Sequence, residues 1–280
     1  MRRALIPLVF VAALLCAGCS DGSGPAEAEA EASAEPAAVA APEVDYGAAV
    51  RTAVAAMQKS SARIDEEILV GGGTDGGTDT FVVSIDGDFD WAGNRGRLGV
   101  GLSSPDSPGK KSPRVDEIFH DGTVYVGGFS ESEGRWGSIR QDRAEAHYLL
   151  RAPVNDPRHV LEQVAQMREV KYLGEDQVDG MGADHYRGEL GWETVTLRMA
   201  KDVRAQADVL QEMLGSIPVH AEVWVDGSGR LVRTRLDWIT GEVGSTVATM
   251  NLTDHGKTVR TAVPAGGVVP VPTLSGPLAG

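Results

Sequence analysis

Residues 221–238 read AEVWVDGSGRLVRTRLDW, and their pattern decides the fold class. Apolar residues alternate with polar ones on both sides of a short glycine-containing segment, residues 226–229. A period of two residues is typical of a strand that has one buried face and one face open to water. Asp and Gly favour the backbone conformations of tight turns. The stretch therefore predicts an antiparallel hairpin whose first strand begins at Val219 and whose second strand ends near Trp238.

A second hairpin is predicted further toward the N-terminus. The runs RVDEIFH (114–120) and TVYVGG (123–128) flank the pair Asp121-Gly122. An Asp-Gly pair between two strand-like runs is among the strongest short-range hairpin signals. Residues that are β-branched, aromatic or alternately apolar predict further strands at 81–85, 95–102 and 244–252.

Three other segments have apolar residues at helical spacing. The first places Val50, Val54, Met57 and Ser61 on one face. The second begins at Asp156-Pro157, a helix-capping residue followed by proline at the first helical position. The third covers about 198–214. The apolar stripes of the second and third are Val160/Leu161/Val164/Met167 and Met199/Val203/Leu210/Met213. Such a stripe can pack into a core or line a void, and spacing alone does not distinguish the two.

The strands follow one another through hairpins, and the helices are inserted between them. This order predicts an α+β fold rather than a parallel βαβ fold.

The N-terminus has the pattern of a bacterial lipoprotein signal. Arg2 and Arg3 precede an uncharged apolar run over 4–17, which is shorter than a membrane span of about 20 residues. Gly18-Cys19 closes the run, so we expect cleavage after residue 18 and lipid attachment at Cys19. Cys16 stands where the usual motif has an aliphatic residue. An ordinary secretory signal with an incidental cysteine is the alternative.

The predicted organisation has four parts. Residues 1–18 are a signal peptide, and 19–45 are the lipidated cysteine followed by a disordered tether of Ala, Glu and Pro. Residues 46–265 form one domain, and 266–280 form a flexible tail in which Pro recurs without alternation. We expect the protein at the extracytoplasmic face of the cell membrane.

Composition excludes some classes of partner. The whole chain has a net charge of −14, and without Arg2 and Arg3 the remaining 24 basic residues face 40 acidic ones, a net charge of −16. This balance argues against nucleic acid and against electrostatic adhesion to anionic lipid. The two cysteines are Cys16 and Cys19, so the exported domain is expected to fold without disulfides.

No motif predicts catalysis. Residues 128–132 read GFSES and depart from a nucleophile elbow at the last position, and the histidines are scattered. Residues 86–90 read DGDFD like the start of a calcium loop, but Trp91 and Arg97 replace the glycine and glutamate that such a loop requires. We therefore predict no catalytic residue, no metal and no cofactor.

Three segments together resemble a known family. They are VDGMGADHYRGEL (178–190), AEVWVDGSGRLVRTRLDW (221–238) and LTDHGKTVRTAVP (252–264). Their order and spacing are similar to mycobacterial lipoproteins of the LppX/LprG (LppX–LprAFG) type and, more broadly, to LolA/LolB-like carriers. The resemblance implies a curved antiparallel sheet, a half-barrel, with helices across its concave face. It also implies an apolar cavity that takes the acyl chains of lipid or glycolipid, and no catalytic residues. No ligand-binding residue carries over by position.

Two functions follow as hypotheses. The first is a membrane-anchored lipoprotein that binds and transfers lipid or glycolipid. The second is an extracytoplasmic protein-interaction or sensor-associated lipoprotein without lipid cargo, which would use an exposed row that includes Trp224.

Overall fold

The computed structural model describes residues 44–72, 81–104, 113–128, 134–215, 218–239 and 244–280. The stretch from Val44 to Gly280 is one compact unit. The predicted signal peptide, Cys19 and the tether as far as residue 43 lie outside the described residues.

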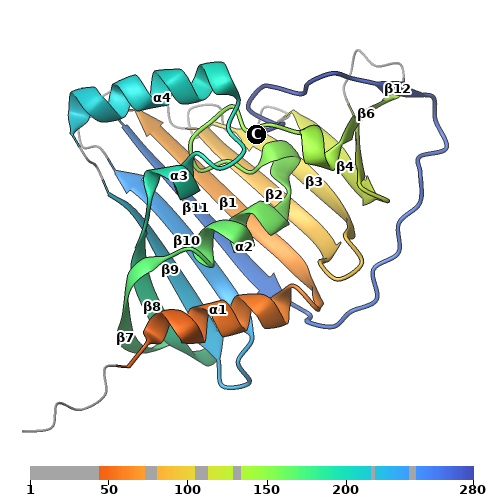
Figure 1. The fold of residues 1–280 in the computed structure, drawn as a ribbon. Helices are drawn as coiled ribbons and strands as arrows, with labels where there is room; N and C mark the ends of the chain where they lie inside the picture. The colour runs from red at the N-terminus through yellow and green to blue at the C-terminus, as the bar shows by residue number, and fades with distance from the viewer. Residues whose placement is uncertain (1–43, 73–80, 105–112, 129–133, 216–217, 240–243) are drawn as a thin grey trace, which may run out of the picture. The chain divides into compact units, whose positions relative to one another are not determined.

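The unit is built on one large sheet (Figure 1). Its strands in chain order are β1 (Ser61–Gly72), β2 (Phe81–Asp90), β3 (Arg95–Ser103), β4 (Arg114–His120), β5 (Thr123–Gly127), β6 (Trp136–Arg140), β7 (Arg168–Val178), β8 (Met181–Leu190), β9 (Val219–Asp226), β10 (Leu231–Ile239), β11 (Gly244–Thr253) and β12 (Val268–Pro270). The helices are α1 (Tyr46–Met57), α2 (Pro157–Val164), α3 (Trp192–Val195) and α4 (Lys201–Leu214), with 3₁₀ turns η1 (Gln141–Arg143) and η2 (Pro153–Asn155).

The sheet is open and almost entirely antiparallel. Its strand order is β12-β6-β5-β4-β3-β2-β1-β11-β10-β9-β8-β7, so β12 and β7 are its two edges. Only β12 pairs in parallel, with β6, among the strands that the structure describes. The sheet curves around α1, α2 and α3, which lie on its concave side (Figure 1). The α+β class and the curved, open sheet predicted above are confirmed.

Both predicted hairpins are present. Asp121 and Gly122 have φ angles of 48° and 71°, the left-handed conformation that a tight two-residue turn needs. In the second hairpin the Asp226 carboxylate accepts hydrogen bonds from the backbone N–H groups of Ser228 and Arg230, at 2.9 and 3.0 Å. A shift in pairing between Leu231 and Arg233 interrupts the predicted alternation, and Val232 joins an outer cluster with Val178, Ala183 and Trp224.

The predicted helices are present with one change. Val50, Val54 and Met57 are buried on α1, but Ser61 lies on β1 because the helix ends at Met57. The Ser61 hydroxyl donates instead to the backbone carbonyl of Lys257, at 2.6 Å. At the start of α2 the Asp156 carboxylate accepts from the N–H of Arg158, which confirms the predicted cap.

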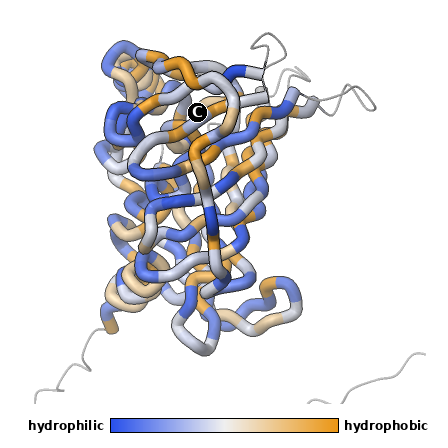
Figure 2. Tube along the Cα trace, turned by 90° about the vertical axis from the view of Figure 1, so that its right-hand side faces the viewer, coloured by the Kyte–Doolittle hydropathy of each residue, from blue (hydrophilic) through white to orange (hydrophobic). Residues whose placement is uncertain are grey.

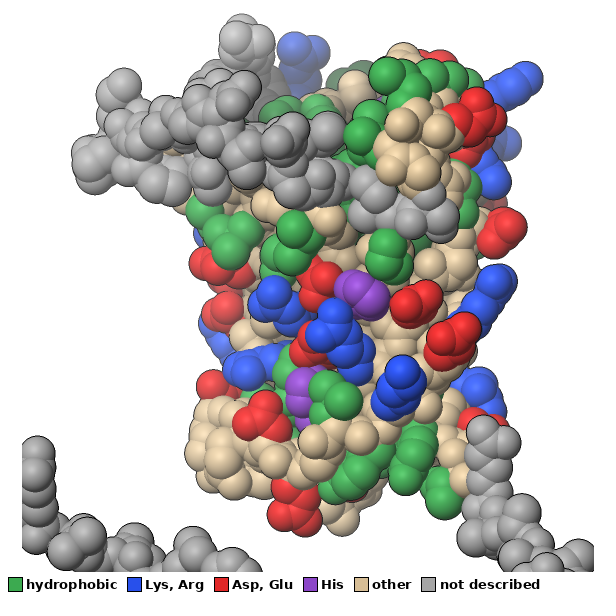
Figure 3. Space-filling model, turned by 90° about the vertical axis from the view of Figure 1, so that its left-hand side faces the viewer, with side chains coloured by type: hydrophobic (Ala, Val, Ile, Leu, Met, Phe, Trp, Pro, Cys, Tyr) green, Lys and Arg blue, Asp and Glu red, His purple; other side chains and the backbone are tan. Residues whose placement is uncertain are grey.

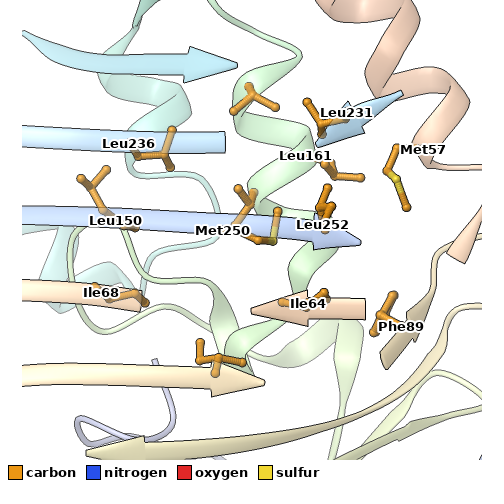
Figure 4. Close-up of a cluster of buried hydrophobic side chains, with 14 of the residues drawn as sticks. Met57, Ile64, Ile68, Phe89, Leu150, Leu161, Leu231, Leu236, Met250 and Leu252 are labelled. Atoms are coloured by element: carbon orange, nitrogen blue, oxygen red, sulfur yellow. The ribbon is translucent and has the colours of Figure 1, made fainter. Parts of the chain in front are cut away.

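The space between α1, α2 and the sheet is filled. Ile64 of β1 and Met250 and Leu252 of β11 lie around Leu161 of α2, and Ile68 lies further along β1 on the side of Leu150 (Figure 4). The α2 stripe Val160/Leu161/Val164/Met167 is buried in this cluster, so it packs into the core and does not line a cavity. Burial of this apolar surface, worth about 25 cal/mol per Å², is the main stabilising contribution.

The C-terminal residues differ from the prediction of a flexible tail. After β11 the chain runs along the β6 side of the molecule to β12 and then turns back over the concave side (Figures 1 and 2). The carbonyls of Ala279 and Gly280 accept hydrogen bonds from the N–H groups of Val154 and His147, at 3.0 and 2.9 Å. Main-chain carbonyls are available whatever the side chains are, which is why hydrophobic spacing gave no sign of this packing.

Within the described residues no helix has the length and apolarity needed to cross a membrane.

Removal of residues 276–280 should destabilise the domain. The deletion removes the carbonyls of Ala279 and Gly280, which accept from the N–H groups of Val154 and His147, and the carbonyls of Pro277 and Leu278, which accept from the side chains of Arg151 and Asn155. A buried donor that loses its partner costs about 1–3 kcal/mol. We expect the free energy of unfolding in urea to fall by about 2–4 kcal/mol. An unchanged urea midpoint would show that these residues contribute nothing to stability.

Candidate functional site

An apolar cavity of about 180 Å³ lies at the end of the sheet where β1 and β10 end. Its lining residues are Val70, Phe81, Tyr148, Leu149, Arg151, Trp238, Thr246 and Pro277. The exposed lining is mostly carbon, so the cavity suits an alkyl group better than a polar molecule.

Strand register builds one wall of the cavity. Phe81 of β2 pairs with Val70 of β1, Val70 pairs with Thr246 of β11, and Thr246 pairs with Trp238 of β10. Residues paired across neighbouring strands point to the same face of a sheet. These four residues therefore form one row, and the cavity lies over it.

The segment that carries Leu149 and Arg151 forms the opposite wall. Leu150, Val154 and Asn155 have φ angles of 55°, 44° and 51°, which side chains other than glycine rarely adopt. Each such residue costs about 1–3 kcal/mol unless its surroundings hold it. This segment donates hydrogen bonds to the carbonyls of the described C-terminal residues and to Glu117 of β4, and these bonds hold its backbone in that conformation.

Arg151 is the one charged residue among those that line the cavity. Its side chain is 3% exposed. Nη1 donates to the carbonyl of Pro277 at 2.7 Å, and Nη2 donates to Oδ1 of Asn155 at 2.6 Å. Its Nε–H has no hydrogen-bond partner among the described residues. Two of its three nitrogens are thus held by the protein, and the third is buried and unsatisfied.

Two buried glutamates face Arg151 from the sheet. Burial raises the pKa of Glu66 to about 7, and the positive charge of Arg151 opposes this shift. Burial raises the pKa of Glu117 to about 8, opposed by the hydrogen bond from Asn155 and the charge of Arg151 and assisted by Asp156. Nδ2 of Asn155 donates to Oε1 of Glu117 at 2.8 Å, whereas Oε2 of Glu117 has no partner in the described part of the chain.

Sequence reasoning missed these glutamates, although a signal for each was present. Glu66 is in phase with the buried Ile64 and Ile68, and Glu117 is in phase with Val115 and Phe119. A carboxylate at an inward position of an alternating strand is unusual because burial of an unpaired charge is unfavourable.

A second polar group lies beside this cluster, at the start of α2. The buried Asp156 carboxylate accepts from Nε2 of Gln141 at 2.9 Å and from Nη2 of Arg158 at 2.7 Å, and Nη1 of Arg198 lies 3.7 Å away. Burial lowers the pKa of the nearby His159 to about 4; the charge of Arg198 lowers it further, and Asp156 opposes both. The Asp156 carboxylate is paired, whereas Nδ1 of His159 has no hydrogen-bond partner among the described residues, and neither residue lines the cavity.

Helix α4 lies at the end of the sheet where β1 ends (Figure 1). Of its predicted apolar stripe only Met199, which precedes the helix, is buried; Val203 and Leu210 are partly exposed and Met213 is 77% exposed. Val209 is also 55% exposed. Nε1 of Trp192 donates to Oδ1 of Asp208 at 2.6 Å and holds the helix in place. The stripe does not line the cavity in this structure.

The predicted exposed row around Trp224 is wrong. Trp224 is 5% exposed, and its ring stacks on His185 with 4.2 Å between centroids. Its Nε1 donates to Oδ2 of Asp176 at 3.0 Å, and the guanidinium of Arg233 lies 5.8 Å from its ring. Neighbours on β8 and β10 cover the side chain because the sheet continues past β9.

The outer face of the sheet carries a polar groove of about 460 Å³ beside Trp224. Its arginines are matched by carboxylates: Arg187 lies 3.6 Å from Glu222, and Arg235 lies 3.6 Å from Asp237. On the side that carries β7 and β8, basic and acidic side chains are intermixed (Figure 3). The described residues that line the groove therefore offer charges that are already paired.

The raised pKa values predict how stability depends on pH. The folded protein retains protons on Glu66 and Glu117 that the unfolded chain loses above about pH 5. The free energy of unfolding should therefore fall as the pH rises from 6.5 to 8.5. His159 takes up a proton below about pH 6.5 in the unfolded chain but only below about pH 4 in the folded protein. Its effect on stability therefore lies mostly below this interval.

In the variant Glu117→Gln, the fall in the free energy of unfolding between pH 6.5 and 8.5, measured by urea unfolding, should be smaller by about 1–2 kcal/mol. Glu67→Gln, on the exposed face of β1, is the matched control and should show the same fall as the wild type. Equal pH dependence in the wild type and in Glu117→Gln would contradict the raised pKa.

Solved structures of other proteins resemble this chain in architecture. No family model and no curated protein matches the sequence. The structure is similar to LprF from Mycobacterium bovis, with 16% identity and a TM-score of 0.47, over 79% of this chain and 97% of LprF. It is also similar to the Mycobacterium tuberculosis lipoprotein LppX, with 16% identity and a TM-score of 0.44, over 76% of this chain and 96% of LppX.

A LolA-superfamily protein from Nitrosomonas europaea is 12% identical, with a TM-score of 0.30, over 79% of this chain and 96% of its own. LprF and LppX are of the type that the three sequence segments resemble. None of these likenesses assigns a ligand, so the function is inferred from the chain's own cavity.

Proposed function

We propose that this chain is a lipoprotein of the cell envelope that binds lipid or glycolipid through an acyl chain and transfers it. The observation that supports the proposal is the apolar cavity bounded by Val70, Phe81, Leu149 and Trp238 at one end of the open sheet. An acyl chain that leaves water for such a site gains about 0.8 kcal/mol per buried methylene.

The size of the cavity limits what it holds. At about 180 Å³ it is smaller than the roughly 300–1,000 Å³ of pockets that enclose a drug-sized ligand. It therefore accommodates part of one alkyl chain, and the rest of a larger lipid stays outside. Val209 and Met213 of α4 expose apolar surface at the same end of the sheet.

We further propose that the protein is held at the extracytoplasmic face of the cell membrane by lipid on Cys19. The 25 residues from 19 to 43 would let the body stand on the order of 30 Å from the membrane if they behave as a flexible coil. The partner-binding alternative depended on an exposed aromatic row, and the burial of Trp224 removes that support.

The experiment that tests the ligand is native mass spectrometry of the secreted Cys19→Ser chain, followed by organic extraction. We expect an added mass that is recovered as lipid. An unliganded mass together with no uptake of added phospholipid, glycolipid or fatty acid would overturn the proposal.

The variant Val70→Phe should obstruct the cavity. The larger side chain occupies space that an alkyl chain would otherwise fill, and we expect about a tenfold loss in lipid affinity, equivalent to about 1.4 kcal/mol. Leu69→Phe is the matched control because it changes the neighbouring residue on the opposite face of β1, and lipid binding should persist. Equal binding by the two variants would place the lipid elsewhere.

The anchor is tested by Cys19→Ser with Cys16→Ser as the control. Metabolic labelling with a radioactive fatty acid should mark the wild type and Cys16→Ser, whereas Cys19→Ser should be unlabelled and leave the membrane fraction. Labelling of Cys19→Ser would show that another residue carries the lipid.

A further inference from the structure

We propose that α4 and two residues near the cavity form a surface that docks on a lipid bilayer. This docking surface consists of Val209 and Met213 of α4 together with Tyr148 and Ile239. The inference rests on the proposed function, because it names the partner with which the cavity exchanges its lipid.

The first observation is that α4 is amphipathic but packs little against the rest of the domain. The helix has 14 residues, and Ala207 is the only one of them that is buried. A helix of this length is marginal in water without packing of its apolar face. Its apolar residues form two neighbouring rows at helical spacing, Val203/Ala207/Leu210/Leu214 and Val209/Met213.

The second row is the exposed one. Val209 and Met213 are four residues apart, so their side chains are neighbours on one face of the helix. Both are mostly exposed, whereas the residues of the first row are buried or partly covered. A single exposed apolar residue needs no explanation, but a cluster of them beside a candidate lipid site indicates an interaction surface.

The other two residues lie at the same end of the sheet. Tyr148 is exposed and lines the cavity. α4 begins beside the segment of Tyr148, because the N–H of Ala200 donates to the carbonyl of Ala146 at 2.9 Å. Ile239 is exposed and follows the cavity-lining Trp238 at the end of β10. That end of β10 pairs with the start of β9, the strand that follows α4.

The length of the N-terminal chain allows this end of the domain to meet a membrane. α1 lies across the opposite end of the sheet, so the described chain begins far from the cavity (Figure 1). β1 joins the two ends with 12 residues, a length of about 40 Å. The 25 residues from 19 to 43 can extend over at most about 80–90 Å. The docking surface is therefore within reach of the bilayer that would hold Cys19.

The proposed anchor favours a bilayer as the partner. Attachment to a membrane gives its surface an effective concentration on the order of 1 mM, so a weak apolar contact is enough for docking. Charge does not contribute, because α4 has two basic residues and three acidic ones, Lys201 and Arg204 against Asp202, Asp208 and Glu212. We therefore expect docking on uncharged lipid, with little dependence on salt.

The test uses the secreted chain with Cys16→Ser and Cys19→Ser, in which an introduced cysteine is the only one. A nitrobenzoxadiazole label on Met213→Cys reports whether α4 enters lipid. Met181→Cys is the matched control, because Met181 is exposed at the opposite end of β8 from the start of β9. With vesicles of phosphatidylcholine at about 1 mM lipid, the emission at position 213 should shift to the blue and rise about twofold. The label at position 181 should not respond.

A substitution tests whether the contact drives binding. Met213→Asp should lower the fraction of protein that floats with the vesicles about fivefold, because a charged side chain does not enter the apolar layer. Met181→Asp should float like the unsubstituted chain. Both side chains are exposed, so neither variant is expected to disturb the fold.

Three results would overturn the docking surface. One is an equal response of the two labels to vesicles, and another is no response at position 213. The third is a dimer without vesicles that Met213→Asp dissociates, because a second copy of the chain would then cover the surface.

This proposal and the proposed function fail in different ways. If position 213 does not respond to vesicles but Val70→Phe still lowers lipid affinity, the cavity binds lipid and only the docking surface is overturned. If position 213 responds but no lipid is extracted or taken up, the protein docks on bilayers and lipid binding in the cavity is overturned.

Discussion

The structure depends on the pairing of β1 with β11. Ten residue pairs, from Arg63–Thr253 to Gly72–Gly244, join strands that are far apart in the chain. They connect the part of the sheet that runs from β12 to β1 with the part that runs from β11 to β7. Bringing such distant strands together lowers the entropy of the chain before their contacts form and stabilise the pair. Burial of Ile64, Ile68, Met250 and Leu252, which these two strands point toward the helices, offsets that loss.

One strand serves both the core and the candidate site. Along the inward face of β1, Ile64 and Ile68 belong to the hydrophobic core, Glu66 lies between them, and Val70 reaches the cavity. The alternation that makes β1 a good core strand therefore also delivers a carboxylate to a place where water is excluded. The side chains under α1 and α2 pack into the core, and the apolar cavity lies at the end of the sheet. Entry of an apolar ligand into this cavity does not require the core to open.

Features that depend on neighbouring residues were predictable, and features that depend on distant ones were not. The hairpin at Asp121-Gly122 and the cap at Asp156 follow from local backbone chemistry, and both are present. The packing of the C-terminal residues depends on main-chain carbonyls, which have no sequence signature. The burial of Trp224 depends on β8 and β10 lying on both sides of β9. The cavity itself required the register of four strands, and alternation alone does not provide a register.

The unusual backbone near the cavity is held by hydrogen bonds that include Arg151, a residue of the cavity lining. Asn155, in the left-handed region, links Arg151 to Glu117 and also donates to the carbonyl of Leu278 at 2.9 Å. The strained segment, the C-terminal residues and the two facing strands thus share one set of hydrogen bonds. A lipid bound in the cavity, as proposed above, would bind only the folded state, in which these hydrogen bonds hold the cavity wall in place, and so would raise the free energy of unfolding. Lipid binding and the stability of the cavity wall therefore depend on the same set of hydrogen bonds.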